Sequence, residues 1–391
     1  MNRRSLLSCG LSYGLRGLLT AGALPLISLA SGCGGGSGSS STALGQLSPD
    51  LTRQIDRIVA DQMTAMRLPG VALTVSIPSQ GQYTSASGKA NLQTGEARTA
   101  DTPFRIASIT KTFTATAVYL LADQGRLSVS DKLAKWYPDF PKADRITIDH
   151  LLRMRSGIVD SIDTAFLAEY FADPTLSLTI DDTIARAAAM SNGHSSDPDQ
   201  ATIYNNVNFQ LLERIVERVS GQPLSQFLQG NILGPLGMTN TYYPTGNDLP
   251  GPNRGYSADL SGNITDKTIL NPSQAGGAGA IISTLADLRI YARALGRGDL
   301  LRSATQTDRL RSQSFAGGPE YAQYGGGLLR LGKFLGHNGT IFGFSSEMWY
   351  LPEKDAVIVI DVNRLDADDA SKSLDLFLRL SKLLFPEYTS W

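Results

Sequence analysis

Ser108 and Lys111, a serine followed three residues later by a lysine, are suited to nucleophilic catalysis. A serine hydroxyl is a weak nucleophile unless a neighbouring base takes its proton. Residues 104–121 read as a strand end, a turn and a helix that opens at Ser108. Residues three apart on a helix share one face, so we expect the lysine amine one turn above the hydroxyl. The helix N-terminus would favour negative charge there, although an exposed surface pair has the same spacing.

Two further motifs carry groups that could move protons or bind a substrate. Tyr204-Asn205-Asn206 follows a polar loop and precedes a helix, and it is the only Tyr-x-Asn in the chain. His337-Asn338-Gly339-Thr340 lies on or beside a strand and is the only His-x-Gly. Each motif alone has an ordinary interpretation, since a single tyrosine usually packs in a core and a strand glycine can mark a bulge. Their order along the chain makes them specific as a set.

As a set, the three motifs resemble those of the serine β-lactamase and penicillin-binding protein family, in particular class C β-lactamases and D-Ala-D-Ala carboxypeptidases. The resemblance implies an α/β (α+β) fold of the β-lactamase/transpeptidase-like type. In that fold an antiparallel sheet flanked by helices carries an inserted all-helical domain, and the site lies between them. The matching segments are 104–111, 155–157, 204–206, 276–287 and 336–340.

The resemblance also implies a role for each motif residue. Ser108 corresponds to the acylated nucleophile, and Lys111 takes part in its deprotonation. Tyr204 corresponds to the general base and the proton donor to the leaving amine, with a phenol pKa lowered from about 10 by a nearby cation. Asn206 would hold the substrate amide. His337 occupies the position of a lysine or histidine that tunes the tyrosine and the substrate carboxylate.

The third motif is expected to line the substrate and the oxyanion hole through Asn338, Gly339 and Thr340, with backbone N–H groups from Ser108 and Thr340. The motif departs from the family in two ways. A histidine stands where class C β-lactamases have lysine, which favours the carboxypeptidase branch, and Asn338 replaces a threonine. Arg330 lies near the position of a carboxylate-binding arginine, but we do not assign it, because a one-residue offset reverses the face of a strand.

Composition and cysteine usage limit the classes of function. The formal net charge of −1 gives no sign of nucleic-acid binding. The only cysteines are Cys9 and Cys33, so the folded part excludes cysteine catalysis and cysteine-based metal sites. Three scattered histidines disfavour a metal hydrolase, and we expect neither a metal nor a cofactor.

The N-terminal residues read as an export signal rather than as part of the fold. Arg3-Arg4 resembles a twin-arginine signal, and residues 17–30 form an apolar stretch of about 21 Å as a helix, too short to span a bilayer. We expect residues 1–32 to be removed, Cys33 to carry lipid, and residues 33–47 to form a flexible tether. The predicted product is a cell-envelope lipoprotein, with ordinary cleavage and release as the alternative.

Strand signals occur near both ends of the folded part and helical signals fill its middle. We predict one domain over residues 48–391, with its sheet part at about 48–107 and 276–391 and its helical part at about 108–275. Residues 244–277, rich in glycine, proline and asparagine, are expected to form a surface loop.

The leading functional hypothesis is a serine D-Ala-D-Ala carboxypeptidase that acts on peptidoglycan stem peptides through a Ser108 acyl-enzyme. A β-lactamase or an esterase uses the same chemistry on the same fold and remains open. A hypothesis of another class is a penicillin-binding sensor or scaffold without turnover. The membrane would be contacted only through the lipid anchor.

Overall fold

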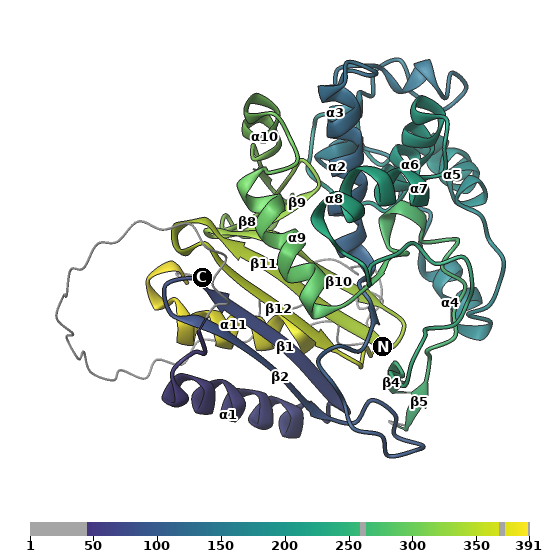
Figure 1. The fold of residues 1–391 in the computed structure, drawn as a ribbon. Coiled ribbons are helices and arrows are strands. Elements are labelled where there is room, and N and C mark those ends of the chain that lie inside the picture. The colour runs from purple at the N-terminus through teal and green to yellow at the C-terminus, as the bar shows by residue number, and fades with distance from the viewer. Residues whose placement is uncertain (1–44, 259–262, 367–371, 390–391) are drawn as a thin grey trace.

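The computed structural model describes residues 45–258, 263–366 and 372–389 (Figure 1). The predicted signal peptide of residues 1–32 and the lipidated Cys33 lie outside these residues, as does most of the predicted tether. In the ranges described, no helix has both the length and the apolar character needed to cross a membrane.

An eight-stranded antiparallel sheet forms the base of the molecule, in the order β2-β1-β12-β11-β10-β9-β8-β7. The first two strands come from the N-terminal part of the chain, and the other six come from its last 80 residues. β1, β11 and β12 are buried along their whole length, because helices cover both faces of the sheet. The strands are β1 Gly70–Ile77, β2 Gly81–Gly88, β7 Gln313–Ser314, β8 Ala322–Gly325, β9 Leu328–Leu331, β10 Phe334–Ile341, β11 Phe344–Leu351 and β12 Ala356–Val362.

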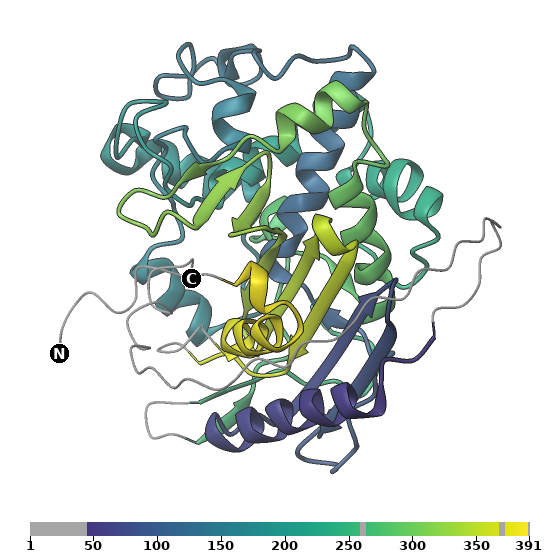
Figure 2. The same cartoon turned by 90° about the vertical axis from the view of Figure 1, so that its left-hand side faces the viewer.

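Three helices pack on this sheet. α1 (Pro49–Ala65) begins where the Ser48 side chain accepts the Leu51 N–H, and proline follows at the first helical position, where its missing N–H costs no hydrogen bond. α1 contacts α11 (Lys372–Leu384), and α11 packs on β11 and β12. α9 (Leu285–Arg297) covers the opposite face (Figures 1 and 2).

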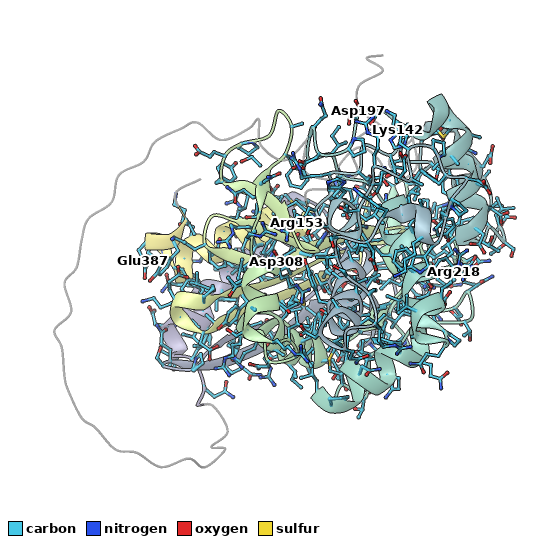
Figure 3. The ribbon with its side chains drawn as sticks, turned by 90° about the horizontal axis from the view of Figure 1, so that it is seen from above. Lys142, Arg153, Asp197, Arg218, Asp308 and Glu387 are labelled. Carbon is cyan, nitrogen blue, oxygen red and sulfur yellow. The ribbon has the colours of Figure 1, made fainter. Side chains whose placement is uncertain are left out.

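A group of helices stands beside the sheet (Figure 1). Its central member, α2, is buried over most of its length and contacts α6 and α7. Arg153 ties this group to the segment before β7, because its guanidinium lies 2.9 Å from the carboxylate of Asp308 in α10 (Figure 3). The helices of this group are α2 Thr110–Asp123, α3 Ile148–Leu152, α4 Thr164–Ala172, α5 Ile180–Ala189, α6 Val207–Ser220, α7 Leu224–Leu228 and α8 Gly234–Leu236, whereas α10 (Ser303–Arg309) lies between α9 and β7 in the chain.

The fold class predicted from the sequence is confirmed: an antiparallel sheet flanked by helices carries a helical part between its strands. The expectation of a surface loop at residues 244–277 is wrong in part. β4 (Tyr256–Ala258) pairs with β5 (Ile264–Asp266), and Leu249 and Leu270 are buried. Glycine and proline mark turns, but they do not show whether a turn-rich segment packs on the core.

Candidate active site

Ser108 lies in a tight turn between the sheet part and the helical part. A 3₁₀ turn at Ala107–Ile109 follows the two-residue strand β3 (Phe104–Arg105), and α2 begins at Thr110. The helix therefore opens two residues later than the sequence suggests. Ala107 has φ +47°, a left-handed conformation that is costly for a residue with a Cβ. The backbone immediately before the serine is thus held by its surroundings in a strained shape.

The Lys111 amine contacts three oxygen atoms. Its Nζ lies 3.0 Å from Ser108 Oγ, 2.8 Å from Asn206 Oδ1 and 2.8 Å from the Ala278 carbonyl oxygen. The side chain is fully buried. The i, i+3 spacing thus brings the amine to the hydroxyl as expected, and a segment 167 residues further along the chain supplies the third contact.

Asp160 determines which end of the Asn206 amide faces the lysine. Its Oδ2 accepts the backbone N–H of Asn206 at 3.0 Å and the side-chain Nδ2 at 2.9 Å. A carboxylate oxygen is an acceptor, so the NH₂ end of the amide must face Asp160 and the carbonyl end must face Lys111. Sequence reasoning missed Asp160, which lies 46 residues before Asn206 and carries no motif of its own.

The contacts of Lys111 suit a base as well as a cation. Burial lowers the pKa of its amine to about 7, while the negative charge of Asp160 opposes that effect. A neutral amine has two N–H groups and one lone pair. Asn206 Oδ1 and the Ala278 carbonyl can only accept hydrogen bonds, so they take the two N–H groups. The lone pair is then left for the Ser108 hydroxyl, which can donate, and Lys111 can take its proton.

Tyr204 stands over the lysine. The Lys111 Nζ lies 4.9 Å from the centre of its ring, within the range of a cation–π contact. The ring also meets His337 and Tyr324 of β8, at centroid distances of 6.1 and 6.0 Å. The structure therefore brings the three sequence motifs together at one place, with Tyr324 as an addition that no motif indicated.

His337 is a neutral group in this site. Burial, and secondarily the charge of Lys111, lower the pKa of its imidazole to about 3. Its Nδ1 lies 2.6 Å from the Asn338 carbonyl oxygen, so Nδ1 carries the proton and donates it. Where class C β-lactamases have a lysine, this chain thus has an uncharged ring that can act through hydrogen bonding but not as a cation.

β10 approaches the serine turn closely at Gly339. A Cβ on this residue would lie 2.1 Å from the Ile106 carbonyl oxygen, so only glycine fits. Ile341 and Phe344 flank the two-residue turn to β11, which places Thr340 at a non-hydrogen-bonded position of the ladder. Its N–H points away from β11, where it could bind an oxyanion beside Ser108.

The segment Arg155-Ser156-Gly157 and the residue after it form hydrogen bonds with the segment that carries Tyr204 and Asn206. Ser156 Oγ donates to Asn208 Oδ1 at 2.6 Å, and Asn205 Nδ2 donates to the Ile158 carbonyl at 2.7 Å. The side chains of Ser156, Asn205 and Asn208 are buried, and they fix the start of α6. These hydrogen bonds hold in place the backbone segment that carries Tyr204 and Asn206.

Metal chemistry has no obvious site in the described residues, where no three histidine, cysteine, aspartate or glutamate side chains cluster as metal ligands would. The arrangement instead offers a nucleophile with a buried amine, a phenol, a neutral imidazole and backbone donors. These are the functional groups that acyl transfer through a covalent serine intermediate requires.

The family model described as Beta-lactamase matches residues 55–380 of the chain. The chain belongs to the beta-lactamase family. It is therefore a serine hydrolase of the β-lactamase and penicillin-binding protein superfamily, and the match spans every site residue above from Ser108 to Thr340.

The chain is similar to several curated proteins and solved structures. Protein flp of Staphylococcus aureus strain N315 is 26% identical over 81% of the chain, and penicillin-binding protein 4* of Bacillus subtilis strain 168 is 26% identical over 68%. The chain spans 64% and 62% of their lengths. The solved D-amino acid amidase from Ochrobactrum anthropi SV3 is 28% identical, with a TM-score of 0.75 over 86% of this chain and 97% of its own.

The phenol of Tyr204 gives a first prediction. Tyr204→Phe should lower kcat by about 10²–10⁴-fold with little change in KM, because proton transfer by a placed side chain is worth that much. The ring contacts with Lys111 and His337 are kept in this variant, so the fold should survive. Steady-state kinetics on the best substrate make the test, and a change confined to KM would mean that Tyr204 only binds substrate.

Proposed function

We propose that this chain hydrolyses amide bonds formed by the carboxyl group of a D-amino acid, through an acyl-enzyme on Ser108. The contact of Ser108 with Lys111, and the approach of Tyr204 and β10 to them, support acyl transfer. Similarity to a D-amino acid amidase and to penicillin-binding protein 4* supports the D-configured substrate. The carboxypeptidase predicted from the sequence and an amidase both fall within this class, and they differ in the leaving group.

The charges around Ser108 favour the amidase, and this is the observation that carries the proposal. A carboxypeptidase must bind the terminal carboxylate of its substrate, which usually requires a cation. His337 is neutral, and each N–H of the Lys111 ammonium already has an acceptor. Arg330, the arginine nearest the family's carboxylate-binding position in sequence, instead donates a hydrogen bond to the Leu310 carbonyl at 3.4 Å.

The acidic side chain beside Asn206 is instead that of Asp160, and burial raises the pKa of this carboxyl above its usual value. An acid at that position suits a substrate with a free α-ammonium group and an uncharged leaving group. A D-amino acid amide has both features. D-Ala-D-Ala carboxypeptidase activity remains the second candidate, supported by the relation to penicillin-binding protein 4*.

A substrate panel decides between these activities. We expect kcat/KM for D-alaninamide and D-phenylalaninamide to exceed that for a D-Ala-D-Ala peptide by at least about tenfold, which is ~1.4 kcal/mol of transition-state binding. The L-amides, benzylpenicillin and a short-chain ester complete the panel, and Ser108→Ala protein corrects for background hydrolysis.

Each result that contradicts the amidase proposal would indicate a different function. Preference for the D-Ala-D-Ala peptide would establish the carboxypeptidase, and rapid turnover of benzylpenicillin would establish a β-lactamase. A preference for the ester would point to an esterase. A stable Ser108 adduct with benzylpenicillin and no turnover of any compound, followed by intact-mass spectrometry, would support the sensor or scaffold.

A further inference from the structure

Glu213 is a buried carboxyl group on α6, apart from the three sequence motifs around Ser108. Its residue is only 4% exposed. Oε2 accepts the backbone N–H of Gly277, and Oε1 accepts the hydroxyl of Tyr243 at 2.9 Å. Burial raises the pKa of this carboxyl to about 7, while both hydrogen bonds oppose that effect. Burying a carboxyl group costs free energy unless hydrogen bonds compensate for the lost water. We therefore ask what the contacts of Glu213 contribute to the site.

The contact with Gly277 belongs to a clamp around the turn 276–278. Thr114 Oγ1 of α2 donates to the Gly277 carbonyl at 2.8 Å, so α2 and α6 hold the two peptide groups on either side of the Gly277 Cα. Gly276 has φ +49°, and a Cβ there would lie 2.5 Å from Glu213 Oε2. Both the conformation and the close approach require glycine at this position.

The clamped turn presents the carbonyl that Lys111 uses. Ala278 follows Gly277 directly, and its oxygen accepts the Lys111 amine at 2.8 Å. Of the three atoms around that amine, this carbonyl and Asn206 Oδ1 are the two that can only accept. Their positions determine where the lone pair of the neutral amine points.

We propose that Glu213 is a positioning residue for Lys111: by holding the Gly277 N–H, it orients the Ala278 carbonyl and so aims the lysine lone pair at Ser108. Asp160 does the same on the other side through Asn206. Two carboxyl groups, one in the loop between α3 and α4 and one on α6, thus fix the two acceptors of one amine. The hydrogen bond to Gly277, rather than the charge of Glu213, carries the effect.

Two variants of Glu213 separate the hydrogen bond from the charge. Glu213→Gln keeps an oxygen for the Gly277 N–H, and its NH₂ can donate to the Tyr243 oxygen. Glu213→Leu has a similar volume but leaves that N–H without an acceptor. Tyr243→Phe is the matched control, because it removes the other partner of Glu213 and leaves the Gly277 contact in place.

The assay follows acylation of Ser108 by p-nitrophenyl acetate, which does not depend on the proposed D-amino acid specificity. We expect Glu213→Leu to lose about 10–100-fold in kcat at nearly unchanged KM, the size of effect that a small misplacement produces. Glu213→Gln and Tyr243→Phe should stay within about threefold of the wild type, well below that effect. Circular dichroism and thermal unfolding check that each variant is folded.

The pH dependence of kcat/KM distinguishes a positioning role of Glu213 from a general loss of structure in the variant. Loss of the Ala278 contact removes a hydrogen bond that stabilises the ammonium, so the acid limb of kcat/KM should move to lower pH in Glu213→Leu. Tyr204, Asp160 and His337, the other titratable groups that face Lys111, are unchanged in every variant.

Three results would overturn the proposal. They are wild-type kinetics in folded Glu213→Leu, a Glu213→Gln variant as impaired as Glu213→Leu, or a wild-type protein that p-nitrophenyl acetate does not acylate. If Glu213→Leu fails to fold, Thr114→Val tests the same turn from α2, because it removes the hydrogen bond to the Gly277 carbonyl. It should lower kcat in the same direction, and an unchanged kcat would again count against the clamp.

Discussion

Ser108→Ala should reduce turnover of every substrate by at least about 10³-fold, because only binding and the oxyanion hole remain once the nucleophile is gone. The hydroxyl is within hydrogen-bond distance of the buried Lys111 amine, and it is held on a turn strained at Ala107. Alanine suits the local backbone, so the fold should be unaffected. The loss should appear in kcat, with substrate affinity largely kept.

Serine to cysteine provides the matched control. Ser108→Cys keeps a nucleophile and should retain covalent labelling by an activated ester, which Ser108→Ala should not show. Intact-mass spectrometry measures the adduct directly and is independent of the turnover assay. Near-normal hydrolysis by folded Ser108→Ala protein would rule out the acyl-enzyme mechanism altogether.

The parts of the site that could be predicted from sequence are those with local or motif signals. The spacing of Ser108 and Lys111 favours their contact, and the contact forms even though a 3₁₀ turn precedes the helix. The meeting of Tyr204 with His337 could not be derived from spacing, since 133 residues separate them; only the family resemblance implied it.

The groups that orient Lys111 were not predictable in this way. Asp160 reaches Asn206 across 46 residues, and Glu213 reaches Gly277 across 64. The Ala278 contact is a backbone carbonyl, so its residue type gives no indication of it. Such contacts depend on how α2, α6 and the turn 276–278 pack, which is information that a pattern of residue types does not contain.

The charge state of His337 is another feature of the site that could not be predicted from the sequence. A histidine in the third motif suggests a group that titrates near neutral pH. Full burial beside Lys111 removes that possibility and leaves a neutral ring. The positive charge of the lysine that class C β-lactamases have here is absent from His337, and our proposal of a D-amino acid amide as the substrate depends on this difference.

The second large effect should come from the lysine amine itself. Lys111→Met keeps most of the side-chain stem and removes the nitrogen, and we expect kcat/KM to fall by about 10²–10⁴-fold, the usual worth of a placed base. In wild-type protein the amine must be neutral to take the Ser108 proton. Since burial lowers its pKa to about 7, kcat/KM should fall as the pH drops below about 7 and level off above it.

Lys111→Arg decides whether the amine acts as a base or only as a cation. A guanidinium stays charged at all accessible pH values, so it can support a Tyr204 phenolate but cannot take the serine proton. If Lys111 is the base, Lys111→Arg should be as impaired as Lys111→Met, and the acid limb near pH 7 should disappear from both profiles. Recovery of activity in Lys111→Arg at alkaline pH would instead assign proton abstraction to Tyr204, whose ring lies 4.9 Å from the amine. The lone-pair geometry set by Asn206 and Ala278 favours the first outcome, because a group needed only for its charge would not require two fixed acceptors that leave one direction open toward Ser108.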